Sequence, residues 1–144
     1  MTPNEIRLIR ESWTGVEPIA DTAASLFYGR LFELDPAIQR LFRRTDMAAQ
    51  RKILMQTLTV VVKSLDKLDQ IVPAVQALGR RHAGYGVREA QYATVGEALL
   101  WTLEQGLGDA FTPDVRSAWA TAYGTLAAVM IEAANADAQA EAAA

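Results

Sequence analysis

His82 is the only histidine of the chain and the side chain with the clearest potential for metal chemistry. It follows Ile71, Val75 and Leu78 at spacings of four, three and four residues, which places it on the apolar face of a predicted helix. A neutral imidazole is the commonest protein ligand of metals such as iron. A histidine on an apolar face is more often a hydrogen-bonded core residue, so the position alone leaves both interpretations open.

Further polar and aromatic side chains occupy predicted apolar faces. Gln50 lies one turn before Leu54, and a buried amide there needs a hydrogen-bond partner unless the helix end is open to solvent. Tyr28 lies on the inward face of the helix predicted for residues 19–34, where aromatic rings are typical of the core. Phe42, at the end of the next short helix, is likewise typical of packing. Each residue alone fits an ordinary core as well as a binding site.

These residues belong to a chain whose apolar pattern is helical almost throughout. Thr2-Pro3-Asn4-Glu5 is typical of a helix start, because threonine and glutamate at this spacing form a capping box. Strand-like alternation is missing, and Thr59–Val62 fits a helical period despite its β-branched residues. The pattern predicts an all-α fold, with breaks at Asp35-Pro36, Arg43 to Asp46, Asp66 to Asp69, Gly84 and Gly86, Gly106 and Gly108, and Thr112-Pro113.

Composition limits the classes of function. A chain of 144 residues with 51% hydrophobic and 22% charged residues suits one globular domain. The absence of cysteine excludes disulfides, zinc–thiolate sites, iron–sulfur clusters and thioether attachment of haem. A net charge of -3 argues against a nucleic-acid partner, although there is a local basic cluster at Arg40, Arg43, Arg44 and Arg51.

The sequence predicts neither a secretory signal at its N-terminus nor a membrane helix. The first residues contain no long apolar stretch, and no window reaches the roughly 18 apolar residues of a membrane helix. We therefore expect a cytoplasmic protein without membrane contact. Residues 133–144 are rich in alanine, and we interpret them as a tail that follows a domain of residues 1–132.

The order of the candidate residues resembles the globin family over essentially the whole chain. Tyr28 precedes Pro36 by eight residues, Phe42 follows it by six, and Trp13 falls where the family packs a tryptophan. Within the family, the chain is most similar to single-domain bacterial globins and to the globin domain of flavohaemoglobins. The segments that carry the resemblance are LFYGRLFELDP, QRLF, QRKILMQTL, LGRRHAGYGV, QYATVGEALL and AWATAYGTL.

The resemblance implies a three-on-three helical fold around a non-covalent haem b. His82 would be the proximal iron ligand, with Phe42 stacked against the macrocycle. Gln50 and Tyr28 would face the bound gas from the distal side, and Leu54 would crowd it. Arg81, or an arginine of the 43–44 corner, would pair with a propionate. The other haem contacts implied on the proximal side are Leu78, Val87, Tyr92 and Val95.

The implied distal pair favours oxygen over carbon monoxide. The outer atom of bound oxygen carries partial negative charge, which a phenol O–H and an amide N–H can both stabilise. Hydrogen bonds to charged acceptors are worth roughly 1.5–3 kcal/mol each. We therefore expect tight binding and slow release of oxygen, and a smaller gain for the less polar carbon monoxide.

Two departures from the flavohaemoglobin pattern bear on the activity. The glutamate that usually joins the proximal histidine and a tyrosine falls on Ala134, while Glu132 lies two residues earlier. These 144 residues include no reductase-like sequence either. We therefore expect reversible binding of oxygen, and of nitric oxide, as a carrier, store or scavenger. The alternatives are a nitric oxide dioxygenase that works with a separate reductase, and the haem sensor domain of a longer chain.

Overall fold

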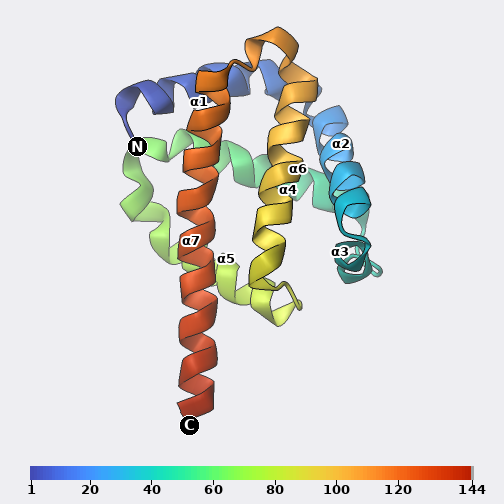
Figure 1. Cartoon of the computed structure of the whole chain (residues 1–144), viewed down its shortest axis with the longest axis vertical. Helices are drawn as coiled ribbons and strands as arrows, with labels where there is room; N and C mark the ends of the chain where they lie inside the picture. The colour runs from blue at the N-terminus through green and yellow to red at the C-terminus, as the bar shows by residue number, and fades with distance from the viewer. Residues whose placement is uncertain (144) are drawn as a thin grey trace.

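A computed structural model describes the backbone of residues 1–143 and the side chains of residues 1–137. This part of the chain is helical, with no strand, as predicted (Figure 1). Short 3-10 turns at Glu17–Ile19, Leu65–Lys67 and Gly108–Ala110 join some of the helices. The helices are α1 (Pro3–Val16), α2 (Ala20–Leu34), α3 (Pro36–Leu41), α4 (Met47–Lys63), α5 (Leu68–Gly84), α6 (Glu89–Leu107) and α7 (Pro113–Ala143).

Most helix ends fall where the sequence predicts them. The Thr2 hydroxyl accepts the Glu5 N–H at 3.1 Å, and the Glu5 carboxylate accepts the Thr2 N–H at 2.9 Å, which completes the predicted capping box. Asp46 caps α4 by accepting the Ala48 N–H at 3.1 Å. The turn predicted at Asp66 to Asp69 is shorter than expected, because α5 already begins at Leu68.

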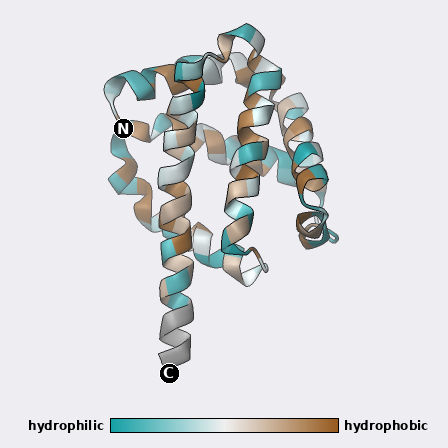
Figure 2. Cartoon of the chain, viewed as in Figure 1, coloured by the Kyte–Doolittle hydropathy of each residue, from teal (hydrophilic) through white to brown (hydrophobic). Residues whose placement is uncertain are grey.

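The helices form two packed groups that share a core. α5 packs chiefly on α7, whereas α2 packs on α6 and α4, and α1 crosses α7, α6 and α4 (Figure 1). Apolar residues gather on one face of each helix between polar ones (Figure 2). Trp13 and Trp119 meet in the core with ring centroids 5.8 Å apart, and their indole N–H groups donate to Thr59 and Ser12. In the described chain, α4 and α5 make little direct contact.

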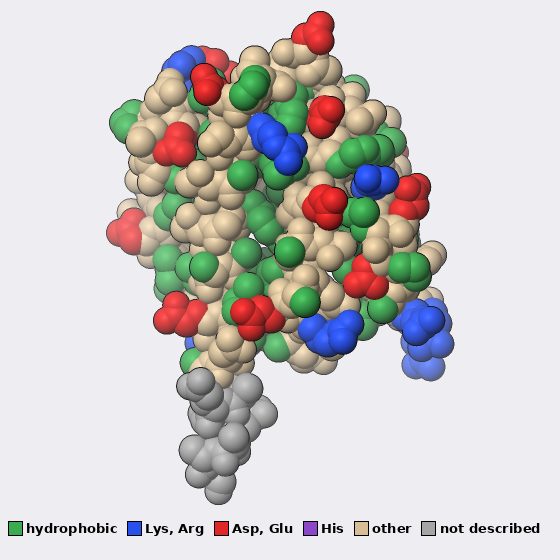
Figure 3. Space-filling view, in the orientation of Figure 1, with side chains coloured by type: hydrophobic (Ala, Val, Ile, Leu, Met, Phe, Trp, Pro, Cys, Tyr) green, Lys and Arg blue, Asp and Glu red, His purple; other side chains and the backbone are tan. Residues whose placement is uncertain are grey.

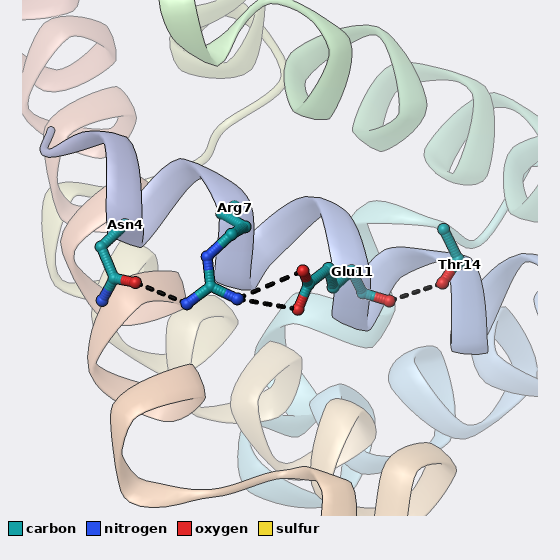
Figure 4. A network of polar contacts seen from close by, with 4 residues as sticks. All are labelled: Asn4, Arg7, Glu11 and Thr14. Atoms are coloured by element: carbon teal, nitrogen blue, oxygen red, sulfur yellow. Dashed lines mark hydrogen bonds and ion pairs between the residues drawn. The ribbon is translucent and has the colours of Figure 1, made fainter.

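The outer face of α1 carries a chain of polar contacts (Figure 4). Arg7 donates to Asn4 at 2.6 Å and to both carboxylate oxygens of Glu11 at 3.2 Å, and Thr14 donates to the Glu11 carbonyl. All four residues are exposed, so the ion pair adds only about 0.3–0.5 kcal/mol. This network stabilises a solvated helix face and is not a binding site.

Helix α7 continues beyond residue 132, into the alanine-rich segment. Ala133 is buried, and Asp137 pairs with Arg80 of α5 at 3.3 Å. The predicted boundary between residues 132 and 133 thus falls inside a helix, and the side chains of residues 138–144 lie outside the described ones. No helix within the described residues has the length and apolar character needed to cross a membrane.

Helices α5 and α7 approach each other closely at Gly79. A Cβ atom at this position would lie 2.5 Å from the backbone carbonyl oxygen of Met130. Backbone cannot give way as a flexible side chain does, so only glycine allows this packing of α5 on α7. The contact sets the position of the helix that carries His82.

Gly79→Ala is therefore expected to lower the free energy of unfolding by about 1–3 kcal/mol, the usual range for overpacking, despite alanine's better helix propensity. Urea denaturation measures the change. Gly124→Ala is the matched control, because no atom outside its own helix lies within 4 Å of the added Cβ. The control should gain up to about 1 kcal/mol. Equal behaviour of the two variants would contradict the close contact.

Candidate functional site

Tyr28 of α2 and Gln50 of α4 meet directly. The Gln50 amide Nε2 donates to the Tyr28 hydroxyl oxygen at 3.1 Å. Tyr28 is only 6% exposed, and its burial raises the pKa of the phenol above the ordinary value, although the bond from Gln50 opposes this. Since the hydroxyl oxygen accepts from Gln50, the phenolic proton stays on Tyr28 and can be donated to a third group.

An aromatic cluster fixes the Tyr28 ring. Its centroid lies 5.0 Å from that of Phe27, in edge-to-face geometry, and 5.5 Å from that of Phe42. Phe32 lies 5.6 Å from Phe42 and 5.9 Å from Tyr28. Such pairs favour defined ring orientations, so the hydroxyl has little freedom to turn away. Phe42 is partly exposed, which leaves ring surface for a further contact.

His82, near the end of α5, is prepared for ligation. Its Nδ1 lies 2.7 Å from the Leu78 carbonyl oxygen, which can only accept, so Nδ1 carries the proton. Burial lowers the pKa of His82, the charge of Arg81 lowers it further, and the Leu78 carbonyl acts in the opposite sense. The imidazole is therefore neutral at neutral pH, and its Nε2 keeps a lone pair for a metal.

The predicted haem contacts are more exposed to solvent than the residues of the core. Arg81 is exposed, as a propionate partner would be. Leu54 lies on α4 and Leu78 on α5, two helices that make little direct contact in the described chain. The partly exposed contacts are Phe42, Gln50, Leu54, Leu78, His82, Val87, Tyr92 and Val95.

These features fit a haem. A flat apolar macrocycle can pack against partly exposed apolar side chains of α4 and α5, and the neutral His82 offers one nitrogen to its iron. In the described residues, no three histidine or acidic side chains lie close enough to hold a bare metal ion. An iron bound through His82 would therefore need the other ligands that a porphyrin supplies.

Two surface hollows lie away from these residues. One of about 510 Å³ lies against α7 at Ile131 and Glu132, and one of about 420 Å³ runs along α1 at Ile6 and Arg10. Neither includes a residue of the predicted site. Their lining is partly charged and open to solvent, so neither suits an apolar cofactor.

Tyr123 of α7 is a residue near the site that sequence reasoning missed. Its hydroxyl donates to the backbone carbonyl of Tyr92 at 2.7 Å, and burial raises the pKa of its phenol. Gly96 makes room for the ring, since a Cβ there would lie 2.8 Å from Tyr123 Cε2. The only sequence signal was the position of Tyr123 in the AWATAYGTL segment.

Among the described residues, no carboxylate lies at the position where the resemblance to flavohaemoglobins would place the glutamate. Ala134 is partly buried at that position, whereas Glu132 is exposed. The groups that set the pKa of His82 are the apolar surroundings, the Leu78 carbonyl and Arg81. The hydrogen bond to a neutral carbonyl leaves the His82 imidazole less electron-rich than a bond to a carboxylate would.

Comparison with known proteins settles the family. Residues 25–130 match the family model described as Globin. The chain belongs to the globin family. This globin is 31% identical to a protein named Flavohemoprotein from Bacillus subtilis (strain 168) over 128 residues, which are 88% of the chain and 32% of that protein. It is 32% identical over 143 residues to a protein named Neuroglobin from Tetraodon nigroviridis, with 90% of each chain covered.

Membership confirms the predicted all-α globin fold and the expectation of a haem cofactor. The globin is thus a haem protein that binds gaseous ligands. It spans about a third of the length of the Bacillus protein.

Proposed function

We propose that this globin binds oxygen reversibly on a haem b held by His82, with Tyr28 and Gln50 on the distal side. The observation that carries the proposal is the 3.1 Å hydrogen bond from the Gln50 amide to the Tyr28 hydroxyl. When bound, the haem supplies an iron that takes up diatomic gases. The protein residues decide which gas is held and for how long.

Tyr28 acts as the main donor to the gas. The amide of Gln50 occupies one lone pair of the Tyr28 oxygen, so the phenolic proton points away from Gln50. The raised pKa of Tyr28 keeps that proton in place at neutral pH. A hydrogen bond to the charged outer atom of oxygen is worth roughly 1.5–3 kcal/mol, and burial protects it from competition by water.

Other residues keep the pocket apolar. Leu54 lies one turn after Gln50 on α4 and limits the space beside the gas. Phe42 packs on Tyr28 and offers its free face to the macrocycle. This arrangement supports slow release of oxygen, because the polar stabilisation is local and the surroundings exclude water. Carrier, store and scavenger are the roles that follow from slow release.

Nitric oxide dioxygenase activity is the second candidate, and the similarity to the Bacillus flavohemoprotein favours it. In this reaction one oxygen, one nitric oxide and one electron give one nitrate. The electron would come from a separate reductase. The neutral Leu78 carbonyl behind His82 argues for the binding role, because it supplies less electron density than a carboxylate.

The test is to supply oxygen and nitric oxide to the haem-loaded ferrous protein and to count nitrate, with and without a flavin reductase. Without the reductase, the protein is expected to give about one nitrate per haem and then stop, because the iron is left ferric. With the reductase, a binding protein is expected to form nitrate only as slowly as its ferric iron is reduced in the absence of nitric oxide, whereas rapid formation of nitrate over many turnovers at one electron per nitrate would establish the dioxygenase instead. Absorption spectra of the ferric, ferrous and carbon monoxide forms check the haem directly.

A further inference from the structure

The charges of the chain are unevenly divided. Residues 36–65 and 70–88 contain nine of the fourteen basic residues, but only one of the seventeen acidic ones, Asp46. Asp46 is engaged as the cap of α4. The rest of the chain holds five basic and sixteen acidic residues. An acidic protein thus carries a strongly positive region on the segments that bear Phe42, Gln50 and His82.

Part of this positive region is continuous in space. A Cβ at Gly86 would lie 3.5 Å from Leu41 Cδ2, so the end of α3 touches the turn between α5 and α6. Basic side chains gather over α3 and the corner that follows it (Figure 3). We call the five exposed arginines on the two sides of this contact the arginine collar: Arg40, Arg43, Arg44, Arg81 and Arg88.

Within residues 1–137 the collar takes part in no ion pair. None of its five arginines pairs with a carboxylate there, whereas Arg51 pairs with Asp21 and Arg80 with Asp137. Tyr85, which precedes Gly86, is 66% exposed, and its ring centroid lies 6.4 Å from that of His82. Tyrosine and arginine are both enriched at protein-binding surfaces.

Each part of the collar adjoins a predicted haem contact. Arg43 follows Phe42, Arg81 precedes His82, and Arg88 follows Val87. A partner docked on the collar therefore approaches the edge of the candidate haem site. Pairing of two arginines with the propionates would still leave three for a partner.

We propose that the arginine collar docks an acidic electron-donor protein at the edge of the haem site. That the partner donates electrons rests on the proposed function, which needs ferrous iron. One electron leaves the reduced cofactor of the donor, which is oxidised by one electron, and the ferric iron of the globin becomes ferrous. No further reactant is required for this transfer.

Charge complementarity favours a protein partner over other polyanions. Arginine pairs with carboxylates through two parallel hydrogen bonds, and the exposed Tyr85 adds apolar ring surface beside His82. The sixteen acidic residues on the rest of the chain would repel a long nucleic acid or an extended anionic membrane. A compact acidic protein surface can contact the collar alone.

The test uses the haem-loaded protein and an acidic flavodoxin as the probe. Calorimetry gives the Kd for the oxidised flavodoxin, and stopped-flow absorbance gives the rate at which reduced flavodoxin reduces the ferric globin. Arg43→Glu with Arg44→Glu is expected to weaken binding and to slow reduction by about tenfold or more at low salt. The effect should vanish near 1 M salt, where the Debye length is about 3 Å.

Lys67→Glu with Arg116→Glu is the matched control, because it changes the net charge equally at two exposed sites outside the collar. The control should change either quantity by less than about twofold. Equal losses in both double variants, or collar-dependent binding to phosphatidylglycerol vesicles but not to flavodoxin, would overturn the proposal. The oxygen dissociation rate is measured in parallel. If only the docking proposal fails, oxygen release stays slow. If the proposed function fails, oxygen release is fast.

Discussion

His82→Ala is expected to abolish stable haem retention. The chain has no second histidine and no cysteine, so the lost iron ligand has no imidazole or thiolate replacement. Loss of the haem should be distinguishable from loss of the fold, since the one hydrogen bond that the His82 ring makes to the described residues joins it to Leu78 of its own helix. Haem content after gel filtration and the ferrous absorption spectrum measure the outcome, while circular dichroism checks the helices.

Two further variants sharpen this test. His82→Gly leaves space for free imidazole, which should restore the spectrum of the ferrous five-coordinate haem without restoring a covalent link to α5. Ala83→Ser changes an exposed neighbour on the same helix that has no predicted haem contact, and should retain haem. Full haem occupancy and an unchanged ferrous spectrum in His82→Ala would refute the assignment of His82 as the ligand.

Tyr28→Phe is expected to raise the oxygen dissociation rate by about tenfold or more. The lost hydrogen bond is worth roughly 1.5–3 kcal/mol, and about 1.4 kcal/mol corresponds to a factor of ten in rate. The ring and its contacts with Phe27 and Phe42 remain, so the pocket should keep its shape. Stopped-flow replacement of oxygen by carbon monoxide measures the rate. The carbon monoxide dissociation rate should move much less, because that ligand accepts weaker hydrogen bonds.

Gln50→Leu should act in the same direction through Tyr28. In the wild type, the Gln50 amide donates to the Tyr28 oxygen. In Tyr28→Phe the amide is free to donate to the gas instead. The effects of the two substitutions on the oxygen dissociation rate should therefore not be additive. Tyr85→Phe removes the same hydroxyl from an exposed ring and serves as the control. If oxygen release is as fast in the wild type as in Tyr28→Phe, then Tyr28 is a core residue only.

Local chemistry made the helix ends predictable. Asp46 caps α4 and Thr2 caps α1 because short polar side chains satisfy the free N–H groups of the nearest helix, and this depends on only three or four neighbouring residues. The period of the apolar residues gave His82 and Gln50 an inward position. The contact of Gln50 with Tyr28 was expected only from the resemblance, because these residues are 22 positions apart.

Contacts that depend on how two helices pack against each other could not be predicted from one sequence. Gly79 gave no signal until its distance to the Met130 carbonyl was known. The hydrogen bond from Tyr123 to the Tyr92 carbonyl joins a side chain to a backbone atom, which leaves no complementary pair of residue types to recognise. The end of α4 at Lys63 is followed by a 3-10 turn at Leu65–Lys67, a local change of backbone that the period of the apolar residues does not mark.

The separate attachment of α4 and α5 has a consequence for how such a protein can evolve. The helix that carries His82 is fixed to α7 by backbone contact at Gly79, whereas the helix that carries Gln50 is fixed to α2. Given the proposed roles, ligation of the iron and discrimination between gases are inherited on different pieces of the chain. Substitutions at Tyr28 and Gln50 can then change how long a gas stays without removing the iron ligand on α5, so a lineage can acquire new gas kinetics while it keeps that ligand.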